Sequence, residues 1–150
     1  MAFTAQTSVT TNSTTNASVG IEVSPSSAII TATNLLPGST SSGTTNVSNT
    51  GSVDEYYFIS ADWSANSFSN SLTTILANTL NVSVTAGSPG TSLYTGTLAG
   101  LIDKPASPGR ALTQATGNED VQFTIALPST AGTLVNALDL NVDFVFVASS

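Results

Sequence analysis

Apolar and polar residues alternate over short stretches of this chain, which is the period of a β-strand with one buried face. The clearest stretch is residues 53–63, which contains two of the three Tyr, one Phe and the single Trp. In a strand, one set of these side chains would face a core, namely Tyr57, Ile59, Ala61 and Trp63. The opposite set suits a surface or a contact with another subunit, namely Tyr56, Phe58, Ser60 and Asp62.

Shorter alternating stretches predict further strands, and Pro or Gly marks where several of them end. Pro25 and Pro128 each stop one such stretch. The predicted strands cover residues 17–24, 28–33, 39–50, 80–84, 93–98, 121–127 and 138–147. The stretch 39–50 is almost entirely polar, so we expect it to lie at the edge of a sheet.

Two regions depart from this rhythm. In residues 71–80 the positions Leu72, Ile75, Leu76 and Thr79 have helical spacing, and Asn70 is a suitable N-cap. These features predict one short helix. Residues 102–118 contain two Pro and two Gly, which predicts a surface excursion in which residues 110–112 pair briefly.

About eight short strands with little helix predict an all-β sandwich of the jelly-roll or Greek-key type, with one short inserted helix. A chain of 150 residues most simply forms one domain. We expect this sandwich to span residues 17–150, after an extended segment over residues 1–16. The expected core residues are Ile21, Val23, Tyr57, Ile59, Trp63, Phe123, Ile125, Val142 and Phe144.

The first 16 residues contain no Gly, no Pro and no charged side chain. Phe3, Ala5, Thr7 and Val9 alternate with polar residues, which favours an extended, weakly amphipathic segment. One interpretation is a disordered terminus. The other is a strand that pairs with something outside its own domain.

The composition excludes several classes of function. Charged residues make up 7% of the chain, and the formal net charge is −7 because Lys104 and Arg110 are the only basic residues. Nucleic acid and anionic membrane surfaces are therefore poor partners. Ser and Thr make up about a third of the residues, far above average usage and typical of β-rich extracellular proteins. No apolar run is long enough to span a membrane.

The sequence contains no pattern of catalytic residues. His and Cys are absent, which removes the usual general base and the soft metal ligands, so we expect neither an enzyme nor a cofactor. The acidic pairs 54–55 and 119–120 are typical of solvated strand ends, although two carboxylates also suit Ca²⁺. Whether the chain binds a metal stays open. Sequons for N-glycosylation occur at Asn12, Asn16, Asn46 and Asn81, a number that composition alone predicts.

Several short motifs occur in an order that resembles the TasA/camelysin family of biofilm-matrix fibre proteins and the related archaeal bundling pilins. They are A-F at 2–3, A-S-V-G-I-E-V at 17–23, N-L-L-P-G at 34–38, V-S-N-T-G-S at 47–52 and V-Q-F-T-I at 121–125, followed by a final L-x-L-x-V-x-F-x-F strand. The resemblance covers most of the chain and is weakest over residues 64–118. Some members of the family were once described as metalloproteases, but this chain lacks a zinc motif. It is also poorer in Lys and Asp than we would expect of the family.

The resemblance implies a secreted jelly-roll subunit that polymerises at the cell surface by donor-strand exchange, in which an N-terminal strand fills a groove in the next copy. Carried onto this chain, the donor strand comprises Ala2, Phe3, Thr4, Ala5, Gln6, Thr7, Ser8, Val9, Thr10 and Thr11. These residues are extended in pattern and free of Pro, as strand addition requires. Head-to-tail linkage makes an open filament.

We therefore expect a structural subunit of a pilus or biofilm-matrix fibre, a homopolymer whose uncharged, hydroxyl-rich surface permits lateral bundling. The first alternative is a monomeric cell-surface or carbohydrate-binding module, for which Tyr56, Phe58 and Tyr94 would be the exposed aromatic residues. The second alternative is a jelly-roll coat protein of a virus.

Overall fold

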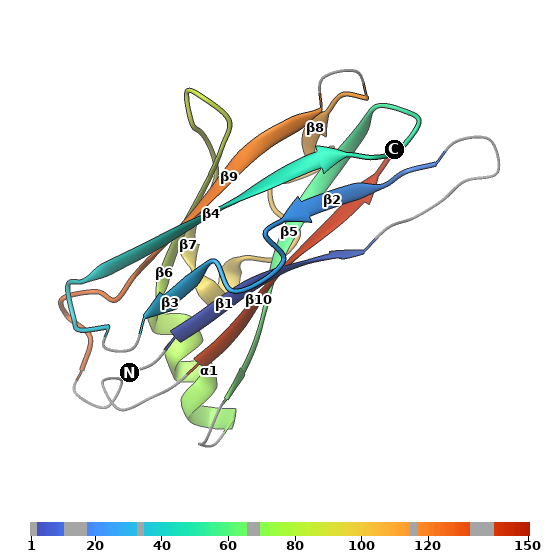
Figure 1. Ribbon diagram of the computed structural model, residues 1–150. Helices are drawn as coiled ribbons and strands as arrows, with labels where there is room; N and C mark the ends of the chain where they lie inside the picture. Colours follow the sequence, from blue (N-terminus) through green and yellow to red (C-terminus); the bar gives the residue numbers. More distant parts are fainter. Residues whose placement is uncertain (1–2, 11–17, 33–34, 66–69, 115–116, 133–139) are drawn as a thin grey trace.

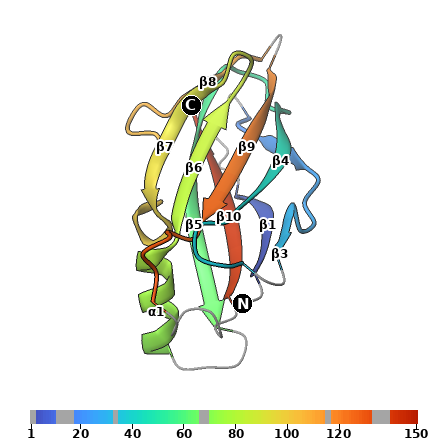
Figure 2. The ribbon, with the colours of Figure 1, turned by 90° about the vertical axis from the view of Figure 1, so that its left-hand side faces the viewer.

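The computed structural model describes residues 3–10, 18–32, 35–65, 70–114, 117–132 and 140–150. Two five-stranded sheets pack face to face (Figure 1, Figure 2). This arrangement confirms the predicted all-β sandwich with one short helix.

The first sheet has its strands in the order β3 (Ile30–Ala32), β1 (Phe3–Thr10), β10 (Leu140–Ser149), β5 (Glu55–Ala65) and β8 (Arg110–Leu112). The second sheet has the order β2 (Ile21–Ser24), β4 (Thr40–Asn49), β9 (Asn118–Ala126), β6 (Asn81–Ala86) and β7 (Thr91–Thr97). A helix, α1 (Asn70–Thr79), lies between β5 and β6 in the chain, and a short 3₁₀ helix, η1 (Leu98–Gly100), follows β7.

From β2 onward, successive strands alternate between the two sheets, except for the hairpin formed by β6 and β7. Neighbours in a sheet therefore come from distant parts of the chain. β10, for example, lies between β1 and β5. The sandwich depends on long-range pairing, because few of its strand ladders are local.

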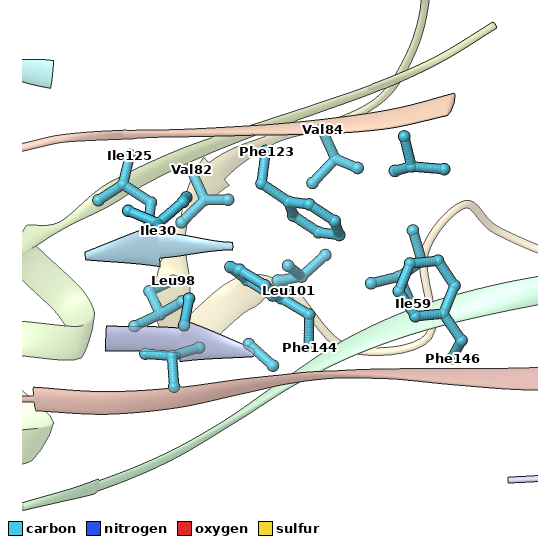
Figure 3. Packing of buried hydrophobic residues seen from close by; sticks show 14 of the residues in the cluster. Ile30, Ile59, Val82, Val84, Leu98, Leu101, Phe123, Ile125, Phe144 and Phe146 are labelled. Atoms are coloured by element: carbon cyan, nitrogen blue, oxygen red, sulfur yellow. The ribbon is translucent and has the colours of Figure 1, made fainter. Parts of the chain in front are cut away.

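Aromatic rings from both sheets meet at the centre of the core (Figure 3). Phe123 of β9 stacks on Phe144 of β10 with ring centroids 4.0 Å apart, and Phe146 meets the edge of Phe123 at 6.1 Å. All three side chains are fully buried. Of the nine residues expected in the core, eight are buried. Trp63 is only half-buried and packs at the margin of the cluster, near the end of β5.

The polar strand β4 is not at an edge, as we had expected, but lies between β2 and β9. The connection from β2 to β3 passes over its inner face. Thr45 is buried there and donates a hydrogen bond to the carbonyl oxygen of Pro25 at 3.2 Å. A side chain at Gly43 would collide with the carbonyl oxygen of Ile29. This interior strand is therefore polar and small because another part of the backbone lies close to it.

The helix α1 forms where the sequence predicts it, but its buried face differs from the expected one. Thr73, Leu76 and Ala77 are buried, whereas Ile75 is 46% exposed. The hydroxyl of Thr79 donates to the carbonyl oxygen of Ile75, as a partly exposed helical Thr commonly does. The helical period was correctly predicted, and the face was decided by contacts with β5, β7 and η1.

Truncating the stacked ring should show how much the fold depends on the contact between the sheets. We expect Phe123→Ala to lower the free energy of unfolding by about 3–5 kcal/mol, because the mutation leaves a cavity in a fully buried site. Trp63→Ala should cost less, since Trp63 is half-buried. Ile75→Ala serves as the control and should change stability by no more than about 0.5 kcal/mol. Urea unfolding measures all three, and a Trp63→Ala cost equal to that of Phe123→Ala would contradict this order.

Candidate assembly site

The N-terminal strand β1 lies inside the first sheet, between β3 and β10. It pairs in parallel with β10 over all eight residues, from Phe3 opposite Leu140 to Thr10 opposite Val147. On its other side it pairs antiparallel with β3 over only three residues. The ladder between β1 and β10 is the only parallel one among the described strands. Within a single chain, therefore, the predicted donor strand occupies a place in its own sheet.

Among the β1 side chains that the structure describes, those that point inward are small. Ala5 and Thr7 are buried, and Val9 is half-buried against the core. The hydroxyl of Thr7 donates to the carbonyl oxygen of Pro25 at 2.8 Å, so its burial leaves no polar group unpaired. The predicted donor residues Ala2 and Thr11 lie outside the described residues. Residues 4–9 of β1 thus hold their place through backbone pairing and the contacts of small side chains.

The structure also shows what the place of β1 would look like if the strand left. The edge of β10 would lose its eight-residue ladder, and Ile29 would lose the hydrogen bond that its N–H donates to the Ala5 carbonyl oxygen at 2.8 Å. Ile30, Phe144 and Phe146 have buried side chains on the strands that border this place. An unpaired edge next to apolar side chains attracts another strand. We call the place between β3 and β10 the β1 groove.

Beside β1, a hollow of about 390 Å³ opens on the outer face of the first sheet. Its lining residues come from three strands and are Thr4, Gln6, Asp62, Trp63, Ser64, Asn141, Val142 and Asp143. Asp143 and Asp62 lie directly opposite each other on β10 and β5, an arrangement that like charges disfavour. Ser8 donates a hydrogen bond to Asp143 Oδ2 at 3.1 Å, whereas Oδ1 is buried and has no hydrogen-bond partner in the described structure. The hollow therefore depends on side chains of β1.

At the end of the sandwich where β9 begins, a charged cluster joins the two sheets. Arg110 binds Glu119 through two hydrogen bonds of 2.9 and 2.7 Å, and the Tyr57 hydroxyl donates to Glu119 Oε1 at 2.7 Å. Burial raises the pKa of Tyr57, and the Glu119 carboxylate raises it further. Burial also raises the pKa of Glu119, but the hydrogen bonds from Arg110 and Tyr57 outweigh it and hold this pKa below its ordinary value. The cluster ties β5 and β8 to β9.

We call residues 1–17 the N-terminal arm. The segment that follows it is fixed to the body of the sandwich by hydrogen bonds. Ser52 N–H donates to the Ser18 carbonyl oxygen at 2.9 Å, and Thr50 N–H donates to the Gly20 carbonyl oxygen at 2.8 Å. Gly20 N–H donates to Glu55 Oε2 at 3.0 Å. Glu55 is 1% exposed, and its Oε1 is buried without a partner among the described residues. Burial raises the pKa of Glu55, and the hydrogen bond from Gly20 offsets this only in part.

Neither acidic pair brings its two carboxylates together. Glu55 points into the core, whereas Asp54 is exposed and accepts a hydrogen bond from Gln114 N–H at 2.8 Å. Glu119 binds Arg110, whereas Asp120 accepts from the amide of Asn46 at 2.9 Å. Adjacent residues of a strand point to opposite faces, so sequence neighbours separate. The described residues contain no group of three or more His, Cys, Asp or Glu that could hold a metal ion.

The described sequons and aromatic residues singled out from the sequence lie on strands other than β1, β3 and β10. Among the sequons, Asn81 is exposed at the start of β6, Asn46 is half-buried and bonded to Asp120, and Asn12 and Asn16 lie outside the described residues. Among the aromatic residues, Tyr56 is 36% exposed, whereas Phe58 and Tyr94 are half-buried. The Tyr94 hydroxyl donates to the Thr97 carbonyl oxygen at 2.6 Å.

Sequence reasoning missed the Tyr57–Glu119–Arg110 cluster. Its three members lie on three strands, and no local pattern joins them. The one available signal was that a chain with only two basic residues places one of them in a predicted strand. The pairing of Thr7 with Pro25 had no sequence signal, because it depends on how two distant segments cross.

Neither a scan against protein-family models nor a search of curated proteins finds a match to this chain. In the part of the chain that the structure describes, no helix is long and apolar enough to cross a membrane.

Replacing the shared acid should weaken the link between the sheets. We expect Glu119→Gln to lower the free energy of unfolding at pH 7 by about 1–3 kcal/mol, because Arg110 and Tyr57 keep only a neutral acceptor. The folded-state pKa of Glu119 lies below its ordinary value of 4.5. The stabilisation is therefore present above about pH 4.5 and is lost as the pH falls through the folded-state pKa. Urea unfolding from pH 3 to 7 should show the difference shrinking in acid, with Asp120→Asn as the control.

Glu55 should make the opposite contribution to the pH dependence. Its folded-state pKa lies above the ordinary 4.5, so the folded protein binds the proton more tightly than the unfolded chain does. This contribution to stability is full below about pH 4.5 and is lost as the pH rises through the folded-state pKa. Glu55→Gln should remove this loss, whereas Glu22→Gln on the exposed face of β2 should not. Equal pH slopes for the wild type and Glu55→Gln would contradict the assignment.

Proposed function

We propose that this protein is a structural subunit of an extracellular filament, a homopolymer whose copies are joined head to tail by donor-strand exchange. The observation that carries the proposal is the position of β1. It is a strand near the start of the sequence, and it lies between β3 and β10 in the first sheet. In a filament, the β1 groove of each copy would receive β1 of a neighbouring copy.

Three features make β1 suitable for exchange. Its inward side chains at 5, 7 and 9 are no larger than Val, so the strand can leave and be replaced with little rearrangement of the core. Its outward residues at 4, 6 and 8 are polar and uncharged, so they tolerate solvent during the transfer. The chain after it is fixed to the body by hydrogen bonds of Ser18 and Gly20. These bonds do not involve β1, so they can persist when the strand moves.

The energetics favour a filled groove over an empty one. An empty groove exposes apolar side chains and the ladder edge of β10, whereas a bound strand restores up to eight residues of pairing. Each backbone hydrogen bond contributes about 0.5–1.5 kcal/mol net, against the entropy of ordering the strand. A second copy carries an identical strand, so it can supply the pairing that an empty groove lacks.

The surface is consistent with an assembly outside the cell. With 7% charged residues and a net charge of −7, the outer faces consist largely of hydroxyl and amide groups. Such a surface allows filaments to lie side by side with little repulsion, so we propose lateral bundling as well. We propose that the subunit acts as a building element and not as an enzyme.

Deleting residues 2–11 tests the proposal. We expect a folded protein that forms no filaments and aggregates more readily, because its groove is empty. Electron microscopy of the full chain and of the truncated chain measures the difference. Filaments of unchanged morphology from the truncated chain would rule out exchange through this strand. A monodisperse full-length protein would instead favour a monomeric surface or carbohydrate-binding module.

Adding the strand back as a free peptide tests the groove itself. A peptide of residues 2–11 at about 100 times its Kd should stabilise the truncated protein by about 2.7 kcal/mol, which is roughly 5–10 °C in Tm for a chain of this size. A peptide with Thr7→Asp should have no effect, because that position is buried. A peptide with the exposed change Gln6→Ser is the matched control and should act like the parent. Equal effects of both variants would contradict binding in the groove.

A further inference from the structure

The direction of β1 within its own chain conflicts with head-to-tail assembly. We propose that β1 enters the neighbouring copy in the reverse direction, antiparallel to that copy's β10. This inference rests on the proposed function and specifies how the two copies meet. It is carried by the parallel ladder, by the place where the arm joins the body, and by the length of the connecting chain.

The sandwich has two ends that can be told apart by their residues. We call one the exit end, where β1 and β10 both end (Figure 1). There Thr10 lies opposite Val147, and Ser52 N–H donates to the Ser18 carbonyl oxygen. We call the other the far end, where Phe3 lies opposite Leu140, which pairs in turn with Ala65. The arm therefore leaves the body at the exit end. In a head-to-tail filament, the exit end of one copy faces the far end of the next.

The connecting chain is too short to keep the present direction in such a filament. Residues 11–17 can separate Thr10 from Ser18 by at most about 28 Å. The paired stretch of eight residues is itself about 26 Å long. A strand that kept its direction would have to bring Thr10 past the whole groove to the exit end of the next copy, and the gap between the copies would come on top of that length.

A reversed strand meets this limit easily, because Thr10 then lies at the far end of the next copy, close to where the arm begins. A strand that kept its direction would instead join two copies exit end to exit end, in a closed exchanged pair, or side by side. Direction therefore decides between an end-to-end filament and other assemblies.

Reversal also improves the pairing. At present the eight-residue ladder with β10 is parallel, and the three-residue ladder with β3 is antiparallel. In the reversed strand the long ladder becomes antiparallel and only the short one becomes parallel. Antiparallel pairing is slightly more stable per residue. The long antiparallel ladder therefore favours the exchanged strand over the strand in its own chain, and the same strands form both ladders.

The side chains of β1 permit this reversal and fix its register. Residues 3–10 carry no charge, and the alternation of inward and outward positions reads the same in both directions. Thr7 is opposite Phe144 and needs the Pro25 carbonyl oxygen for its buried hydroxyl. Turning the strand about this pair keeps Thr7 in place and keeps Ala5 and Val9 on the inner face. Thr4 then moves from its position opposite Asn141 to one opposite Val147.

Disulfide cross-linking separates the two directions, and the chain contains no native Cys that would interfere. Thr4→Cys with Asn141→Cys reports the direction seen within one chain, since the two residues are direct partners. Thr4→Cys with Val147→Cys reports the reversed strand. Within one chain these two positions are six residues apart along the ladder, about 20 Å, which is too far for a disulfide. All three positions lie on the outer face, outside the core.

Filaments of each double variant are verified by electron microscopy, oxidised and run on a denaturing gel. We expect filaments with Thr4→Cys and Val147→Cys to shift from the monomer band to a ladder of covalent multimers. The Thr4→Cys and Asn141→Cys variant should give only cross-linked monomer, from unassembled protein. A product from Thr4→Cys with Val145→Cys instead would support the reversed direction and overturn the register centred on Thr7.

Interchain products from the Thr4→Cys and Asn141→Cys variant would overturn the reversal while leaving strand exchange intact. Covalent dimers would then indicate the closed pair, and a ladder would indicate copies side by side. Filaments in which no variant forms an interchain disulfide would overturn the proposed function itself, because β1 would not be the strand that joins the copies.

Discussion

Eight residues of β1 pair in parallel with β10, and this ladder joins β3 and β1 to the other three strands of the first sheet. The ladder gives β10 a neighbour on each side and brings Ala5 and Thr7 into the core. It also places Thr4 and Gln6 at the hollow and Ser8 beside Asp143. Each of these contacts is lost if the strand leaves, and an identical strand from another copy can restore the pairing along β10 and return Ala5 and Thr7 to the inner face.

The main side-chain contacts between the two sheets do not depend on β1. The stacked rings of Phe123 and Phe144 join the two sheets at the centre, and the Tyr57–Glu119–Arg110 cluster joins them at the exit end. Neither contact involves β1. The segment after the arm is fixed by Ser52, Thr50 and Glu55. A body that keeps its contacts without the strand is a physical requirement for exchange between copies.

The buried polar groups of this protein occur where backbone segments from different parts of the chain cross. Thr7 and Thr45 both donate to the Pro25 carbonyl oxygen, from two different sheets. Glu55 accepts from Gly20 and retains a buried oxygen without a partner in the described structure. About a third of the residues in this chain are Ser or Thr. Their small hydroxyl groups can donate hydrogen bonds to the backbone carbonyl oxygens that are buried at such crossings.

The sequence by itself determined the strands and the faces they bury, because alternation with period two specifies which side chains point inward. Tyr57, Ile59, Phe123 and Phe144 were predicted in the core on this ground, and they are buried. Alternation says nothing about which strand lies next to which, or in which direction. The interior position of β4 and the parallel pairing of β1 were therefore decided only by the tertiary structure. Phe3 and Leu140 are more than a hundred residues apart, and their pairing depends on the packing of the whole sandwich.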